Sequence, residues 1–132
     1  ASNCPVLKSV KFYNNTLLKN VGSLPSTIET LYVDECKSLE SVNLINMIDL
    51  TDSKFYIGKV PALKTFVYTA SNDKNAKYLT KLDLSGATNL ESIQLQGFKG
   101  NYITLALSAK KTLTDINFAN SSIQYIRWFD RS

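Results

Sequence analysis

The sequence predicts a β-solenoid, that is, a stack of short parallel strands with little helix. Across its 132 residues one apolar spacing recurs: an apolar residue, a second three positions later, and a third two positions after that. The stretch 79–84 (LTKLDL) shows this spacing, and the stretch 90–95 (LESIQL) repeats it. The intervening residues are rich in Ser, Thr and Asn and poor in Ala, a composition that disfavours helix.

The repeat covers most of the chain, and its starts lie about eleven residues apart. With any apolar residue allowed, the triplets are Leu7, Val10, Phe12; Ile28, Leu31, Val33; Leu39, Val42, Leu44; Leu63, Phe66, Tyr68; Leu79, Leu82, Leu84; Leu90, Ile93, Leu95; Tyr102, Leu105, Leu107; Leu113, Ile116, Phe118; and Ile123, Ile126, Trp128. Weaker half-matches begin at Leu18 and Leu50. Two stretches carry extra residues, 56–62 and 69–77, and we expect the second to be an exposed loop.

The spacing has a direct structural meaning. Side chains two residues apart point to the same face of a strand, so the second and third apolar residues share one face, and the first lies on the bend that leads in. Such a short strand needs copies above and below it, because neighbouring strands then satisfy each other's backbone groups. We therefore expect two strands per turn, on opposite sides, and about 22 residues per turn. A helix does not explain the third position, which lies far round a 3.6-residue helix.

The pattern predicts which side chains form the core and what lies at the two ends. We expect these residues to be buried on parallel strands: Leu82, Leu84, Ile93, Leu95, Leu105, Leu107, Ile116 and Phe118. A solenoid exposes apolar surface at its ends unless they are capped. We expect Trp128 to cover the last core layer, whereas Cys4, Pro5 and Val6 offer only a thin lid at the start.

The repeat resembles that of the leucine-rich repeat family, L-x-x-L-x-L-x-x-N/C-x-L, with about 20 to 29 residues per unit. The stretch 7–17 matches in full, and the unit that begins at Ile28 places Cys36 at the Asn or Cys position. The resemblance implies a leucine-rich repeat solenoid in which Cys36 turns inward and bonds the backbone of the bend. Later units depart from the pattern, with Ala87, Phe98, Lys110 and Ser121 at that position.

Within this family the stretch 79–90 is similar to repeats of bacterial cell-surface proteins, including some internalins, in which both sides of the solenoid carry short strands. The stretch 24–42 also resembles repeats of plant resistance proteins. We favour the bacterial surface group, which implies an extracellular or cell-surface location. Residues 1–132 would then be a single leucine-rich repeat domain of a longer precursor, and a chain that starts at Ala1 is either processed or a fragment.

Composition excludes several classes of protein. The net charge is +4, but the lysines are spread from Lys8 to Lys111, whereas nucleic-acid binders concentrate charge on one patch. No apolar stretch approaches the roughly 20 residues that span a bilayer. The two cysteines, Cys4 and Cys36, do not make a disulfide framework; they pair or, as we expect, remain two buried thiols. The sequence carries no indication of a particular oligomeric state.

The chain lacks several residues and motifs on which catalytic sites commonly depend. It contains no histidine, the usual general base and zinc ligand, so a Ser-His or Cys-His pair is impossible. No phosphate-binding glycine pattern is present, and Asp34 and Glu35 would point to opposite faces of a strand. We expect no enzyme activity, no cofactor and no metal site. Asn14 and Asn120 begin N-x-S/T sequons, which matter only in a eukaryotic secretory setting.

Two surfaces remain as candidates for binding. The first face, made by outward residues of alternate strands, is rich in Tyr, Lys, Asp and Arg, which binding surfaces favour. We expect its ligand-binding residues to be Tyr13, Tyr32, Tyr56, Lys11, Asp34, Lys54 and Arg127, with the three tyrosines in a row across neighbouring turns. The second face, around Asn43, Gln94 and Asn117, is mostly small and polar. A plainer explanation is that Tyr and Thr are good strand formers.

These observations favour a non-catalytic binding module that recognises a protein or a glycan through its first face. The alternative is a structural spacer or capping segment of a larger repeat protein, without a ligand of its own. An exposed patch of tyrosines would favour the binding module, and buried tyrosines would favour the spacer.

Overall fold

The computed structural model describes residues 7–22 and 24–130, which form a parallel β-solenoid of about five turns, spaced about 23 residues apart, with almost no helix. The strands are β1 (Ser9–Tyr13), β2 (Asn20–Val21), β3 (Thr30–Asp34), β4 (Ser41–Met47), β5 (Phe55–Ile57), β6 (Thr65–Ala70), β7 (Asp83–Leu84), β8 (Ser92–Gln96), β9 (Tyr102–Ala106), β10 (Asp115–Ala119) and β11 (Tyr125–Phe129). Two short 3-10 helices are η1 (Asp52–Lys54) and η2 (Leu107–Lys111). The predicted fold of stacked parallel strands is confirmed.

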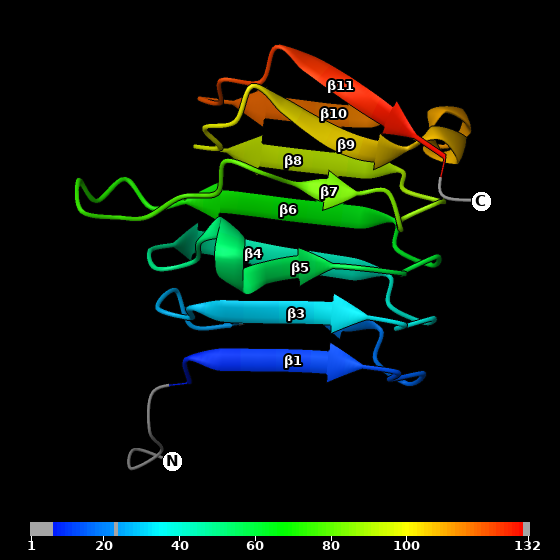
Figure 1. Cartoon of the computed structure of the whole chain (residues 1–132), viewed down its shortest axis with the longest axis horizontal. Helices are drawn as coiled ribbons and strands as arrows, with labels where there is room; N and C mark the ends of the chain where they lie inside the picture. Colours follow the sequence, from blue (N-terminus) through cyan, green and yellow to red (C-terminus); the bar gives the residue numbers. More distant parts are fainter. Residues whose placement is uncertain (1–6, 23, 131–132) are drawn as a thin grey trace.

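Odd-numbered strands lie on one side of the solenoid and even-numbered strands on the other (Figure 1). The first face, toward the viewer in Figure 1, consists of two three-stranded sheets, β1-β3-β5 and β7-β9-β11. The second face is one five-stranded sheet in the order β10-β8-β6-β4-β2. Every pairing is parallel and joins strands of successive turns, and among the described strands β5 and β7 are the neighbours that do not pair.

The strand register follows the apolar repeat. On the second face Val42 pairs with Phe66, Phe66 with Ile93, and Ile93 with Ile116. Residues at the first position of the triplet, such as Leu63 and Leu90, are also fully buried. Stacked apolar layers therefore fill the space between the two faces, as the pattern predicts, and they supply the dominant stabilising term of the fold.

A repeated pair of backbone hydrogen bonds joins successive turns near the start of several strands. Two consecutive N–H groups donate to one carbonyl of the preceding turn: those of Glu29 and Thr30 bond the Lys8 carbonyl at 2.8 and 3.1 Å. The same pairing recurs at Glu40 and Ser41, Lys64 and Thr65, Glu91 and Ser92, and Thr114 and Asp115. These donors lie between the first and second apolar positions of each unit, so one main-chain interaction locks the register of each turn on the last.

Two core predictions are wrong. Leu107 lies in η2 and is 44% exposed, because in β9 Ile103 pairs with Ile126 and Leu105 with Trp128. The inward residues are therefore Ile103 and Leu105, and the triplet that begins at Tyr102 is shifted by two. The first position of this unit is Gly100, where an added Cβ would lie 2.1 Å from the Thr80 carbonyl oxygen.

The other error concerns the last strand of the second face. Ile116 in β10 is 47% exposed and Phe118 is only partly buried, because no described strand stacks beyond β10. Trp128 packs against the core at this end and is partly buried, in agreement with its predicted position over the last layer. The predicted lid of Cys4, Pro5 and Val6 lies outside the described residues.

The bends after the strands use left-handed backbone. Positive φ occurs at Asn14, Glu35, Asn46, Gly97 and Asn120, each two residues after the third apolar position of its unit. Asn and Gly tolerate this conformation better than other residues. Asn or Gly occupies four of these five positions, which explains how the chain turns sharply after those strands.

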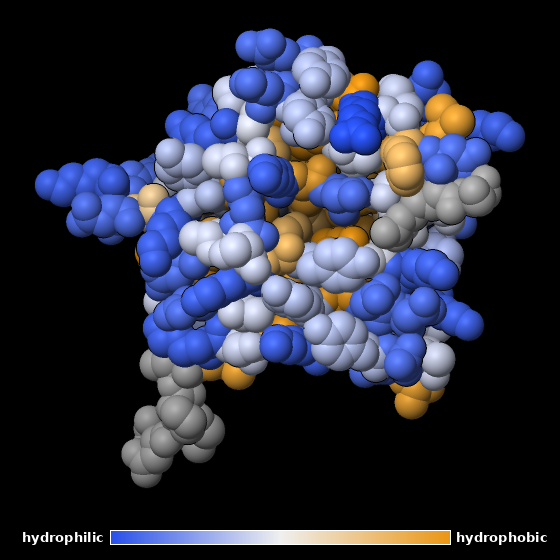
Figure 2. All heavy atoms as spheres, viewed as in Figure 1, coloured by the Kyte–Doolittle hydropathy of each residue, from blue (hydrophilic) through white to orange (hydrophobic). Residues whose placement is uncertain are grey.

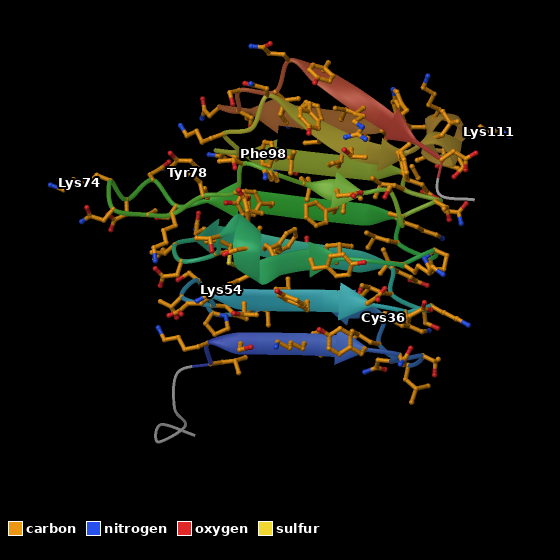
Figure 3. All side chains as sticks on the ribbon, viewed as in Figure 1. Cys36, Lys54, Lys74, Tyr78, Phe98 and Lys111 are labelled. Carbon is orange, nitrogen blue, oxygen red and sulfur yellow. The ribbon has the colours of Figure 1, made fainter. Side chains whose placement is uncertain are left out.

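Two further predictions about the bends are confirmed. Cys36 is a buried free thiol that turns inward, and its Sγ donates to the carbonyls of Phe12 (3.6 Å) and Asp34 (3.5 Å). The predicted loop 69–77 is confirmed for residues 71–77, with Lys74 at its projecting end (Figure 3), whereas Thr69 and Ala70 belong to β6 and Thr69 is buried. No helix within the described residues is long and apolar enough to span a membrane.

Candidate ligand-binding cleft on the first face

The first face is interrupted between β5 and β7, although the second face is continuous. Among the described strands these two are neighbours on the first face, but no pairing joins them. The 3-10 helix η1 runs directly into β5, and the N–H of Lys54 bonds the Thr51 carbonyl locally (3.1 Å) instead of the preceding turn. On the other side of the interruption, β7 has only two residues.

Asp52 completes the backbone ladder at this interruption. It lies three residues before Phe55, at a position where other units have an apolar residue. Its Oδ1 accepts hydrogen bonds from the backbone N–H groups of Thr80 (2.8 Å) and Lys81 (3.1 Å), and its Oδ2 accepts from the Thr80 hydroxyl. In the other turns a main-chain carbonyl takes this pair of donors. A side chain therefore replaces the main-chain acceptor of the missing strand pairing.

A cleft of about 510 Å³ opens at the interruption. The buried side chains of Ile57 and Leu82 line its depth, and the partly buried Phe55 lies beside them. Figure 2 shows apolar surface at the bottom of a hollow on this face, surrounded by hydrophilic side chains. The volume lies within the roughly 300 to 1,000 Å³ that is usual for ligand pockets.

Two tyrosines reach the cleft from opposite sheets. Tyr56 on β5 is 42% exposed, and Tyr102 on β9 is 38% exposed. Each is held by a neighbouring ring: Tyr56 lies 6.2 Å from Tyr32, tilted by 50°, and Tyr102 is stacked on Tyr125 at 5.2 Å and 14°. Rings that are already supported lose little freedom when a ligand packs on them.

The rim of the cleft is charged. The charged residues that line it are Lys81, Lys99, Arg127, Asp52 and Asp83. Both oxygens of Asp52 are engaged by Thr80 and Lys81, as described above, and Asp83 Oδ1 accepts from the Ser85 N–H (2.8 Å). Three cationic groups therefore face two carboxylates, and the small positive excess favours an anionic group in the cleft.

The structure brings only part of the predicted binding set to this cleft. The predicted residues were Tyr13, Tyr32, Tyr56, Lys11, Asp34, Lys54 and Arg127. Tyr56 and Arg127 line the cleft, and Tyr32 supports Tyr56 from behind. Lys54 lies on η1, exposed at the surface of the same face (Figure 3).

The prediction that Tyr13, Tyr32 and Tyr56 form one row is wrong. The register pairs Tyr32 with Tyr56 on one side and with Lys11 on the other, and it pairs Tyr13 with Asp34. Tyr13 follows the third apolar position of its unit, whereas Tyr32 lies between the second and third. The row is therefore Lys11, Tyr32 and Tyr56, with Lys11 Nζ 5.3 Å from the centroid of the Tyr32 ring.

Asp34 has a structural role in the bend after β3. Its Oδ1 accepts from the N–H groups of Glu35 (3.0 Å) and Lys59 (2.9 Å), which links two successive turns. It also closely approaches Gly58, where an added Cβ would meet Asp34 Oδ1 at 2.0 Å. These contacts hold the carboxylate against the backbone, so it is poorly placed to meet a ligand.

Sequence reasoning missed Tyr102 and the role of Asp52. The pattern that begins at Tyr102 places this residue at the first apolar position, whereas the structure has the triplet of that unit two residues earlier. The available indications were the pair Ile103 and Leu105, which alternates correctly, and an aspartate at an apolar position of the repeat.

The titratable side chain of Tyr68 lies in the core and contacts the segment that leads into β7. Tyr68 on β6 is fully buried, and its hydroxyl accepts a hydrogen bond from the Leu79 N–H (3.1 Å). Burial raises the pKa of Tyr68 above its ordinary value of 10.0; the Leu79 hydrogen bond opposes this shift, and the nearby Asp52 adds to it. Among the described residues no cluster of three His, Cys, Asp or Glu could hold a metal ion.

Comparison with known proteins adds no family to these observations. No family model, curated protein or solved structure matches the chain. The function is therefore argued from the site itself.

Proposed function

We propose that this protein is a non-catalytic binding module that recognises a protein or a glycan through its first face. The observation that carries the proposal is the cleft between β5 and β7, where Tyr56 and Tyr102 project from two separate sheets beside Arg127. Exposed Tyr and Arg around a concave site are typical of binding surfaces. The parallel strands on either side keep the site in shape without a ligand, which lowers the entropic cost of binding.

We also propose that the chain is a leucine-rich repeat domain that acts at a cell surface, with the bacterial surface proteins as the nearest type. Support comes from the full match of the repeat in 7–17 and from the strands on both sides of the solenoid. Further support comes from Cys36, whose thiol bonds the backbone of the bend as the resemblance implies. Secretion of the full-length precursor, followed by surface labelling, tests this location directly.

Binding through the first face can be tested by nuclear magnetic resonance. The ¹⁵N-labelled protein is titrated with neutral, N-acetylated and acidic tetrasaccharides and with peptides selected on the immobilised protein by phage display. We expect at least one probe to shift the amide signals of Tyr56, Tyr102 and Arg127. We expect Tyr56→Ala to reduce those shifts at a given probe concentration, and Gln94→Ala on the second face to leave them unchanged.

Two outcomes would contradict the proposal. Shifts centred on Asn43, Gln94 and Asn117 would place the ligand on the second face. If no probe of any class bound, the spacer function would become the better explanation.

A further inference from the structure

The cleft on the first face combines three kinds of chemistry in one site. Tyr56 and Tyr102 present ring faces, Asn101 and Thr104 present amide and hydroxyl groups, and Arg127 presents a cation at the rim. A ligand that satisfies all three must have a flat apolar surface, several hydrogen-bonding groups and a negative charge. This set of demands restricts the class of ligand more than the composition of the whole face does.

A saccharide meets the first two demands better than a peptide. Peptide segments bind grooves that are lined mainly by apolar side chains, or they add a strand to a sheet edge. Here the apolar residues, such as Ile57 and Leu82, lie deep in the cleft, and the accessible walls are tyrosine rings among polar groups. A sugar ring offers C–H groups to an aromatic face and hydroxyl groups to the polar residues around it.

Charge restricts the class further. Lys81, Lys99 and Arg127 line the cleft with only Asp52 and Asp83 to balance them, so the lining has an excess of positive charge. A guanidinium can hold a carboxylate through two parallel hydrogen bonds, which gives both strength and orientation. A neutral sugar would offer no anion to these cations, of which Lys99 and Arg127 contact aromatic rings within the described part of the chain, those of Tyr78 and Phe129.

We infer that the cleft binds an acidic saccharide, in which a pyranose ring packs on Tyr56 or Tyr102 and its carboxylate is held by Arg127 with Lys81 and Lys99. This inference rests on the proposed binding function and names the class of ligand for the same site. Tyr56 and Tyr102 belong to different sheets, so binding depends on the interruption between β5 and β7.

The test uses three matched probes on the whole 132-residue chain. Tetragalacturonate carries both rings and carboxylates, its methyl ester keeps the rings without the charge, and tetraglutamate keeps the charges without the rings. Isothermal titration calorimetry measures affinity, and ¹⁵N chemical shifts locate the site. We expect tetragalacturonate to bind at least about tenfold more tightly than either control probe, and added salt to weaken it.

Variants separate the two contributions. Arg127→Ala should weaken tetragalacturonate about tenfold or more, and Arg127→Lys should recover only part of this loss. Tyr56→Ala should weaken both tetragalacturonate and its methyl ester by about fivefold. Tyr13→Ala and Lys64→Ala are matched controls outside the cleft, and each should change affinity by less than about twofold.

The outcomes distinguish this inference from the broader function. Equal affinity for tetragalacturonate and its methyl ester, or tight binding of tetraglutamate alone, would overturn the acidic saccharide while leaving a binding cleft. Shifts of Tyr56 and Tyr102 amides by a selected peptide, with no response to any sugar, would also overturn it. If Lys64→Ala weakened tetragalacturonate as much as Arg127→Ala, the attraction would be a general charge effect and the assigned site would be wrong.

Discussion

The two faces of the solenoid are built from the same apolar repeat but differ in continuity. The second face is a single five-stranded sheet, whereas the first face is two three-stranded sheets with no pairing between β5 and β7. The core beneath the interruption is nevertheless complete, because Leu82 and Leu84 stay buried there. The apolar layers and the backbone hydrogen-bond ladder are therefore separable, and a cleft can open where only the ladder is broken.

The largest effect should come from a core layer of the continuous face. Ile93 and Ile116 are register partners on β8 and β10, but Ile93 is fully buried and Ile116 is about half exposed. Ile93→Ala should lower the free energy of unfolding by about 2 to 5 kcal/mol, because it leaves a cavity in a packed layer. Ile116→Ala should cost less than about 1.5 kcal/mol, because water already reaches that side chain.

Denaturant unfolding followed by circular dichroism measures both variants, and the difference between them is the test. Similar losses at the two positions would mean that β10 is covered in solution and that the layers do not end there. A negligible loss for Ile93→Ala would contradict the stacked core itself.

The next largest effect should come from the interrupted face. Asp52→Ala removes the acceptor of the Thr80 and Lys81 N–H groups and should cost about 2 to 3 kcal/mol. Asp52→Asn keeps an oxygen in place and should cost about 1 kcal/mol or less. Hydrogen exchange at the Thr80 and Lys81 amides should speed up in Asp52→Ala and stay slow in Asp52→Asn.

If Asp52→Ala were as stable as the native protein, the carboxylate would not hold the two halves of the first face together. Equal losses in the Ala and Asn variants would show that the negative charge, and not the position of the acceptor, is what matters.

Most of the fold could be predicted from the sequence because the apolar spacing directly indicates which side chains face inward. Units such as 79–84 and 90–95 are correctly placed by that spacing alone. The errors arise where an apolar residue is exposed for another reason. Leu107 belongs to a 3-10 turn, and Ile116 faces inward on the last described strand of the second face, where no described strand stacks over it. A pattern within one unit cannot reveal whether a further unit covers it.

The site was harder to predict because it depends on how units pair across turns. The sequence indicated Tyr56 and Arg127 as outward residues, and both line the cleft. It could not place Tyr13 opposite Asp34, since that pairing follows from the register of β1 on β3. The cleft itself results from a lost strand pairing, which appears in the sequence only as Asp52 at an apolar position.

A smaller effect is expected where the chain crosses from the second face to the first. Tyr68 on β6 accepts a hydrogen bond from the Leu79 N–H, just before the strand β7 that flanks the interruption. Tyr68→Phe leaves that buried donor without its acceptor and should cost about 1 to 2 kcal/mol at neutral pH. Thermal and denaturant unfolding of the two proteins measures this difference.

The difference in stability between the native protein and Tyr68→Phe should depend on pH. Burial raises the pKa of Tyr68 in the folded protein above 10.0, so the unfolded chain releases this proton first as pH rises. The stabilising contribution is therefore complete below pH 10 and is lost as pH rises through the folded value. The stability advantage of the native protein over Tyr68→Phe should shrink above about pH 10. An advantage that grew with pH would mean that the folded state favours the ionised phenol.

The smallest effect on stability is expected at the tyrosines of the interrupted face. Tyr32 and Tyr56 contact each other outside the core, and the Tyr32 hydroxyl bonds the Ser53 carbonyl at 3.3 Å. Their replacement, Tyr32→Ala with Tyr56→Ala, should lower the free energy of unfolding by less than about 1 kcal/mol, because no apolar layer depends on them.

The same double variant should lose binding to any ligand of the cleft, since it removes one aromatic wall and the ring that supports it. A variant that unfolds would show that the two tyrosine rings belong to the core, and the spacer function would gain. A variant that stays folded and still binds would place the ligand on the continuous second face, so that the interruption would serve only the fold.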